Sequence, residues 1–176
     1  MYHVCQQLTV INNAMSGSEP VTIDNRQLAT DQHWMQQALE LARKAEELGE
    51  VPVGAVVVLE NKLIGKGWNQ PISAHDPSAH AEIVAIRDAS HHLKNYRICN
   101  ASLYVTLEPC TMCAGAIIHA RIQRLVYGAM DPKTGAAGSV FNVFQSNLHN
   151  HKVEITNGIL ADECCNILQT FFQERR

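Results

Sequence analysis

Hydrophobic positions along the chain recur in two periods, one typical of helices and the other typical of strands. Residues 31–49 carry apolar side chains at helical spacing, which predicts an amphipathic helix that begins at Asp31 and ends near Gly49. Residues 53–60 are almost continuously apolar and rich in β-branched side chains, which predicts a buried strand. Residues 63–68 follow after a short polar break, so these two strands are expected to form a hairpin.

The same two patterns continue to the end of the chain. Further helices are predicted over 80–91, over 110–120 and from about 160 onward, and further strands over 103–106, 125–127 and 153–155. This order predicts an α/β fold, in which a mixed sheet of about five strands has helices on both faces. Residues 1–30 hold only three charges and no sustained period. We therefore expect a poorly ordered arm over 1–30, followed by a single domain over 31–176.

Composition restricts the class of protein. The chain has 176 residues, of which 46% are hydrophobic and 18% charged, so it is expected to bury a core and not to be disordered. Its longest apolar run, within 53–59, is far short of the roughly 20 residues that a membrane helix needs. We expect a cytoplasmic protein with no membrane association and, because no P-loop or G-x-G-x-x-G motif is present, no nucleotide cofactor.

The formal net charge of −3 argues against binding to nucleic acid through bulk charge alone. The charge is nevertheless uneven. Residues 1–90 hold 6 basic and 11 acidic side chains, whereas residues 91–176 hold 8 basic and 6 acidic ones. A polyanionic partner is therefore expected to contact the second half of the chain.

Two short motifs carry the chemistry, and each lies at the start of a predicted helix. One is His80-Ala81-Glu82, and the other is the Pro-Cys-Thr-Met-Cys segment that contains Cys110 and Cys113. Cysteines at i and i+3 share one face of the first helical turn, where the helix N-terminus favours thiolates. Together with the imidazole of His80 they form a ligand set typical of Zn²⁺.

Three protein ligands leave one tetrahedral position of a zinc ion for water, which the metal makes acidic. Glu82 is then suited to accept the proton of that water and to pass it on. Two alternatives stay open at this point: the C-x-x-C pair is a redox pair or a coincidence, or a fourth ligand from Cys99, Cys164 or Cys165 makes the site structural.

At these motifs the chain resembles the zinc-dependent nucleoside and base deaminases, whose signature is H-x-E…P-C-x-x-C. Longer segments, such as 51–55, 103–116, 131–138 and 153–164, resemble the bacterial tRNA-specific adenosine deaminases. The resemblance covers about residues 32–176. It implies the three-layer α/β/α fold of the cytidine deaminases, a homodimer with one zinc ion per subunit, and conversion of the wobble adenosine of an arginine tRNA to inosine.

The resemblance also implies roles for individual residues. His80, Cys110 and Cys113 would hold zinc, and Glu82 would move protons. Asn69 would hydrogen-bond the adenosine that is flipped out of the anticodon loop, and the backbone of Gly54 and Ala55 would line the base pocket.

Two features allow more than one interpretation. Asp131 is either a turn residue before Pro132 or an acceptor for a ribose 2′-hydroxyl, which would favour RNA over DNA. The helix over 110–120 is apolar nearly all round, so it is either covered by its own domain or packed against a second subunit.

The function has alternatives as well. The protein is then a deaminase of free guanine, cytosine or a nucleoside, or a non-catalytic RNA-binding module stabilised by zinc.

Overall fold

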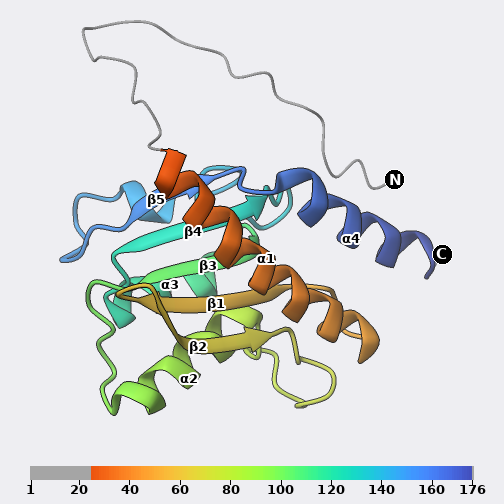
Figure 1. The fold of residues 1–176 in the computed structure, drawn as a ribbon, viewed down its shortest axis with the longest axis horizontal. Coiled ribbons are helices and arrows are strands. Elements are labelled where there is room, and N and C mark those ends of the chain that lie inside the picture. Colours follow the sequence, from red (N-terminus) through yellow and green to blue (C-terminus); the bar gives the residue numbers. More distant parts are fainter. Residues whose placement is uncertain (1–24, 176) are drawn as a thin grey trace, which may run out of the picture.

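A mixed five-stranded sheet between two layers of helices makes up residues 25–175, the part of the chain that this computed structural model describes (Figure 1). The elements are, in chain order, α1 (Asn25–Glu47), β1 (Gly54–Leu59), β2 (Lys62–Trp68), α2 (Ala81–Leu93), β3 (Ser102–Leu107), α3 (Thr111–Ala120), β4 (Arg124–Ala129), the 3₁₀ turn η1 (Val143–Gln145), β5 (Glu154–Asn157) and α4 (Ala161–Gln173). The predicted fold class is confirmed, and each predicted strand and helix is present, although the first helix has a different start; only η1 was not predicted. Among the helices of residues 25–175, none combines the length and the apolar character needed to cross a bilayer.

The strand directions place several loops at one edge of the sheet. The order of the strands is β2-β1-β3-β4-β5. β1 is antiparallel to both β2 and β3, whereas β3, β4 and β5 are parallel. It follows that β2, β3 and β4 all run in the same direction, so their carboxyl ends lie at the same edge. The predicted hairpin of β1 and β2 is confirmed, and its turn residues Glu60 and Asn61 have positive φ angles of 50° and 57°.

Helices cover the sheet on both faces. α1 and α4 contact each other on one face, and α2 and α3 contact each other on the opposite face. α2 lies directly on the backbone of β2, because Gly65 and Gly67 leave room for it: a Cβ atom on either glycine would come within 2.5 Å of a backbone atom of Ala85. This close contact sets the height of α2 above the sheet, and with it the position of the N-terminus of α2.

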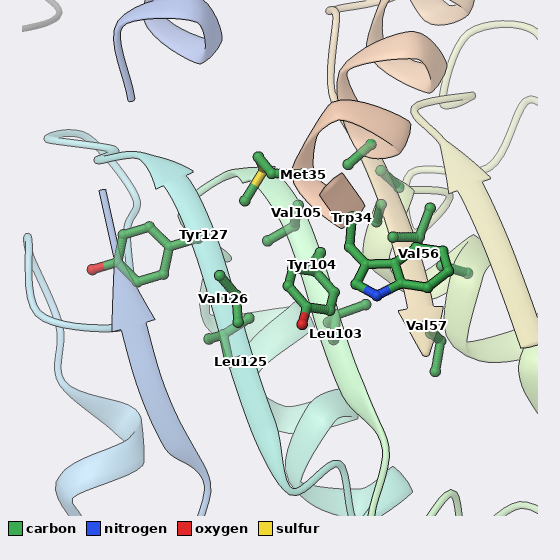
Figure 2. Close-up of a cluster of buried hydrophobic side chains, with 14 of the residues drawn as sticks. Trp34, Met35, Val56, Val57, Leu103, Tyr104, Val105, Leu125, Val126 and Tyr127 are labelled. Atoms are coloured by element: carbon green, nitrogen blue, oxygen red, sulfur yellow. The ribbon is translucent and has the colours of Figure 1, made fainter. Parts of the chain in front are cut away.

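The core lies on both faces of the three central strands. β1, β3 and β4 are buried along almost their whole length, which explains why their sequences are nearly continuous apolar runs. Figure 2 shows side chains of these strands and of α1 gathered in one cluster, in which Trp34 and Met35 of α1 lie over the sheet beside Tyr104 of β3. The Nε1 atom of Trp34 donates a hydrogen bond to Asn61 in the hairpin turn (3.2 Å), which ties α1 to the end of the β1–β2 pair.

The first helix begins earlier than the sequence pattern predicts. It starts at Asn25 and not at Asp31, so residues 25–30 of the expected arm belong to α1. The reason is that Asp31 does not cap a helix: its side chain is buried and accepts a hydrogen bond from Gln27 one turn earlier (2.9 Å), while Leu28 packs against the core. The rest of the expected arm, residues 1–24, lies outside the described part of the chain.

Asp31 is the centre of a buried polar network that joins α1 to three strands. The guanidinium of Arg124 on β4 binds both carboxylate oxygens of Asp31 at 2.7 Å and also donates to the hydroxyl of Thr156 on β5. The hydroxyl of Tyr104 donates to the same carboxylate at 3.0 Å. Burial alone raises the pKa of Asp31, but the hydrogen bonds from Arg124 and Gln27 and the charge of Arg124 outweigh burial and lower it overall.

This network predicts a pH-dependent contribution of Asp31 to stability. Asp31→Asn leaves the buried Arg124 charge without its partner and is expected to lower the free energy of unfolding at pH 7 by about 3 kcal/mol. Because the pKa of Asp31 is lower in the folded state than in the unfolded chain, the contribution is complete above about pH 4 and is lost as the pH falls through the folded-state pKa. In urea titrations, the difference between wild type and Asp31→Asn should therefore narrow below pH 4.

The matched control is Glu40→Gln, which removes an exposed carboxylate from the same helix and is expected to change stability by less than about 0.5 kcal/mol. Equal stability of wild type and Asp31→Asn at pH 7, or a difference that does not vary with pH, would contradict this account of the network.

Candidate metal centre and substrate pocket

Two helices begin at the edge of the sheet where β2 and β3 end. His80 precedes the first residue of α2, and Cys110 precedes the first residue of α3. Both residues have an extended backbone, with ψ angles of 153° and 174°, and neither side chain caps its own helix. Because β2 and β3 run in the same direction, and α2 and α3 lie on the same face of the sheet, these two helix starts meet.

His80, Cys110 and Cys113 form a group that can hold a metal ion. The Nδ1 atom of His80 lies 3.7 Å from the Sγ atom of Cys110 and 3.6 Å from that of Cys113. A tetrahedral zinc ion with one nitrogen and two sulfur ligands requires ligand atoms about 3.5–3.8 Å apart, so the observed spacing fits. Within residues 25–175 the metal-binding group contains these three residues, and the cysteines considered as a fourth ligand do not join it.

The two thiols share one proton in an asymmetric way. The hydrogen bond from the Cys113 thiol, assisted by His80, lowers the pKa of Cys110 to about 4. The thiolate of Cys110 and the burial of Cys113 raise the pKa of Cys113. The hydrogen bond with Cys110 also raises the pKa of His80. The thiolate of Cys110, the form of cysteine that binds metal ions, therefore lies beside the N-termini of α2 and α3.

Glu82 lies in the first turn of α2, two residues after His80. Its side chain is only 4% exposed, and this burial raises the pKa of its carboxyl group. The thiol of Cys113 lies close to this carboxyl group and lowers its pKa by less than burial raises it. An acid with a raised pKa beside a metal-binding group is suited to accept and return a proton during a reaction.

A hollow of about 240 Å³ opens in front of the metal-binding group. It is lined by Val51, Val53, Asn69, His80, Glu82, Leu107, Glu108, Cys110, Asp131 and Thr134. The structure thus brings five of the residues singled out in the sequence, from four separate segments, to a single pocket. Asn69 reaches it from the loop after β2, where its Oδ1 atom accepts a hydrogen bond from the backbone N–H of Ala81 (3.2 Å) and its N–H donors are left for a ligand.

Gly54 and Ala55 do not line this hollow. The backbone N–H of Gly54 donates to the hydroxyl of Thr106 (3.2 Å), and Gly54 has no side chain because α1 passes directly over it. Ala55 is completely buried in β1. The hollow is instead lined by Val51 and Val53, which precede β1 in the chain.

Asp131 follows β4, and its side chain stabilises a tight turn. Its Oδ1 atom accepts hydrogen bonds from the backbone N–H groups of Lys133 (2.9 Å) and Thr134 (3.2 Å), and its Oδ2 atom accepts one from the hydroxyl of Thr134 (2.6 Å). The turn interpretation of Asp131 is therefore confirmed. Asp131 also lines the hollow.

Glu108 is a residue of this pocket that the sequence analysis did not single out. It is 2% exposed and accepts hydrogen bonds from the backbone N–H groups of Asp131 (3.1 Å), Ala137 (2.8 Å) and Ser139 (3.1 Å), and from the hydroxyl of Ser139. An acidic residue directly after a buried strand was the available signal, because a buried carboxylate needs several donors. The donors come from a loop more than 20 residues away and could not be identified from the sequence.

Comparison with known proteins defines the class of the molecule. A family model described as MafB19-like deaminase matches residues 29–176, so the chain belongs to this deaminase family. Among curated relatives, the tRNA-specific adenosine deaminase of Haemophilus influenzae is 58% identical over 147 residues, covering 83% of this chain and 85% of the relative. The enzyme of the same name from Bacillus subtilis is 42% identical and covers 85% of this chain and 92% of the relative. Within the deaminases, the chain is a member of the tRNA-specific adenosine deaminases.

Solved structures show the same fold. A tRNA:A34 deaminase studied for A-to-I editing at the wobble position of transfer RNA is 47% identical, with a TM-score of 0.75, and covers 77% of this chain and 99% of its own. A guanine deaminase from Nitrosomonas europaea is 23% identical, with a TM-score of 0.70, and covers 90% of this chain and 98% of its own. At 23% identity, the similarity to the guanine deaminase shows a shared fold and carries no conclusion about activity.

Proposed function

We propose that this enzyme converts adenosine to inosine by hydrolysis at the wobble position of the anticodon of an arginine tRNA, in the cytoplasm. The observation that carries the proposal is the metal-binding group of His80, Cys110 and Cys113 at a pocket that Glu82 also lines. The relatives of the chain are tRNA-specific adenosine deaminases. The tRNA:A34 deaminase with the same fold supports the wobble position as the target.

The metal of the proposed reaction is zinc, one ion per subunit, held by His80, Cys110 and Cys113. Two sulfur atoms and one imidazole nitrogen at the observed spacing fit zinc better than calcium or magnesium, which prefer oxygen ligands. When bound, zinc makes a water molecule acidic enough to act as a nucleophile near neutral pH.

Glu82 carries the protons of the reaction. Burial favours the neutral form of its carboxyl group, so a proton taken from water is held there and not lost to solvent. The same carboxyl group can give this proton to N1 of the purine. It can then take the proton of the hydroxyl group added at C6 and give it to the departing amine, so that ammonia leaves and inosine remains. The first turn of α2 places this buried carboxyl group beside the metal-binding group.

Asn69 orients the base in this scheme. The backbone N–H of Ala81 occupies the oxygen of its amide, so its N–H groups are directed to acceptors on the nucleoside. Gly54 and Ala55 follow Val53 at the start of β1, and their proposed role is to support the part of the pocket that Val53 lines. Flipping a nucleotide costs a few kcal/mol and costs least where bases are unpaired, which favours an anticodon loop over a duplex as substrate.

An assay on tRNA with a matched variant tests the proposed function. Wild-type protein should contain about one zinc ion per chain and should form inosine at the wobble position of arginine tRNA. Glu82→Ala should keep its zinc but lose activity by about 10²-fold or more, because the proton carrier is missing. Metal analysis and sequencing of the treated tRNA measure both outcomes.

The same assay separates the rival functions. Free adenosine, guanine and cytosine are included as substrates, and turnover of a free base without reaction on tRNA would replace the proposal with a base deaminase. If Glu82→Ala keeps the tRNA binding and the biological activity of wild type, the protein is a zinc-stabilised RNA-binding module and the proposed reaction is wrong.

Asp131 is proposed to distinguish RNA from DNA. Its carboxylate lines the pocket, and a carboxylate accepts a hydrogen bond from a ribose 2′-hydroxyl but is repelled by phosphates. Asp131→Asn keeps an oxygen for the turn, since Asn also occurs in such turns, and removes the charge. We expect activity on a single-stranded DNA loop to rise relative to activity on the same RNA loop, by about tenfold or less. An unchanged ratio in paired assays would exclude this role.

We also propose that the enzyme is a homodimer that uses the outer face of α3. The inner face of α3 packs against the domain through buried residues such as Cys113 and Ile117. Its outer face presents Met112, which is 38% exposed, together with Gly115, which is half-buried. Small and apolar side chains on an exposed helix face favour close packing against a second copy.

Gly115→Glu tests this interface. A Cβ atom at Gly115 meets nothing within 4 Å in the single subunit, so the change should leave the subunit folded while placing a charge in the contact. Light scattering at micromolar concentration should give twice the mass of one 19.5 kDa chain for wild type and one chain for Gly115→Glu. Gln36→Glu, at an exposed position of α1, is the control and should remain dimeric. A monomeric wild type would contradict the proposal.

A further inference from the structure

The buried carboxylate of Glu108 binds the loop 131–139, which forms one wall of the pocket. Both oxygens of Glu108 are used: Oε1 accepts from the backbone N–H groups of Ala137 and Ser139, and Oε2 accepts from the N–H of Asp131 and the hydroxyl of Ser139. All four donors belong to the loop 131–139, which follows β4, whereas Glu108 follows β3. With 2% exposure, the carboxylate has these protein donors in place of water.

The loop is shaped around this side chain. A Cβ atom on Gly135 would lie 2.5 Å from the carboxyl carbon of Glu108, so residue 135 is glycine because the carboxylate occupies the space. The N–H of Ala136 donates to the carbonyl of Pro109 (2.8 Å), and Gly135 forms an antiparallel bridge with Cys110. The loop 131–139 is therefore hydrogen-bonded to the segment Pro109–Cys110, and the carboxylate of Glu108 is enclosed between the two segments.

We propose that Glu108 is a positioning residue for substrate binding: its carboxylate holds Asp131 and Thr134 at the wall of the pocket. This inference rests on the proposed function, because it assigns Glu108 a role in binding the nucleotide that is deaminated. Glu108 does not act on the proton carrier, which lies on α2, and none of its hydrogen bonds goes to that helix. Its loss should therefore weaken substrate binding more than it slows the chemical step.

The geometry requires a carboxylate and not an amide. In Glu108→Gln, an NH₂ group in the place of Oε1 would face two backbone N–H donors, neither of which can accept a hydrogen bond. An NH₂ group in the place of Oε2 would face one backbone donor, while the hydroxyl of Ser139 can turn and accept. The second orientation is the better one, so the variant should lose chiefly the hydrogen bond to the N–H of Asp131.

Glu108→Gln therefore tests the proposal with two independent measurements. Amide exchange followed by NMR should become about tenfold faster at Asp131, with little change at Ala137 and Ser139. On tRNA, KM should rise about threefold to tenfold while kcat changes less than about twofold. Zinc content, measured in the same preparation, should be unchanged, because the metal ligands keep their positions.

Two control variants complete the experiment. Ser139→Ala removes the hydroxyl donor but leaves the Asp131 contact, and it should leave KM within about twofold of wild type. Asp88→Asn makes the same carboxylate-to-amide change at an exposed contact with the N–H of Lys66 and should leave both KM and the exchange rates unchanged.

The outcomes distinguish this inference from the proposed function. If wild type does not deaminate tRNA, the proposed function fails, while the exchange rates still report whether Glu108 holds the loop. If wild type is active and Glu108→Gln shows wild-type KM, the inference is overturned. Loss of zinc or a fall in kcat at constant KM also overturns it, since Glu108 would then act on the metal centre.

Discussion

The direction of three strands is the constraint on which the site depends. β2, β3 and β4 run the same way, because β1 between β2 and β3 is antiparallel to both. Asn69 follows β2, Cys110 follows β3 and Asp131 follows β4, so segments about 20 to 40 residues apart in sequence end at one edge. Ligand sites in open α/β sheets form outside the carboxyl ends of strands, and here two helix N-termini add their positive dipole ends.

Close packing turns this arrangement into a metal-binding geometry. Gly65 and Gly67 let α2 rest on the backbone of β2, and the height of that helix sets where its first residues stand. The Nδ1 atom of His80 then lies 3.7 Å from the Sγ atom of Cys110, which precedes α3, and 3.6 Å from that of Cys113 within α3. A side chain at Gly65 or Gly67 would push α2 away from the sheet, because its Cβ atom would lie within 2.5 Å of backbone atoms of that helix. Metal-binding geometry is sensitive to such displacements.

Three buried carboxylates, those of Asp31, Glu108 and Glu82, differ in their hydrogen-bond partners and in their roles. Asp31 is neutralised by Arg124 and joins α1 to the sheet. Glu108 is surrounded by the donors of a single loop. Glu82 is buried with fewer donors, and its pKa is raised. The first two are satisfied and support the structure, whereas the third is left able to exchange a proton, which is the property a hydrolytic site needs.

The sequence by itself determined the strands and the helices and indicated the residues of the metal-binding group, because periodicity and i, i+3 spacing are local properties of a chain. Only the tertiary structure decided the rest. Whether Asp31 begins a helix depended on Arg124, 93 residues away. Whether Gly54 faces the pocket depended on α1 lying over it. The partners of Glu108 depended on β3 and β4 ending side by side. Burial and hydrogen bonding between distant segments are set by packing, which no local pattern encodes.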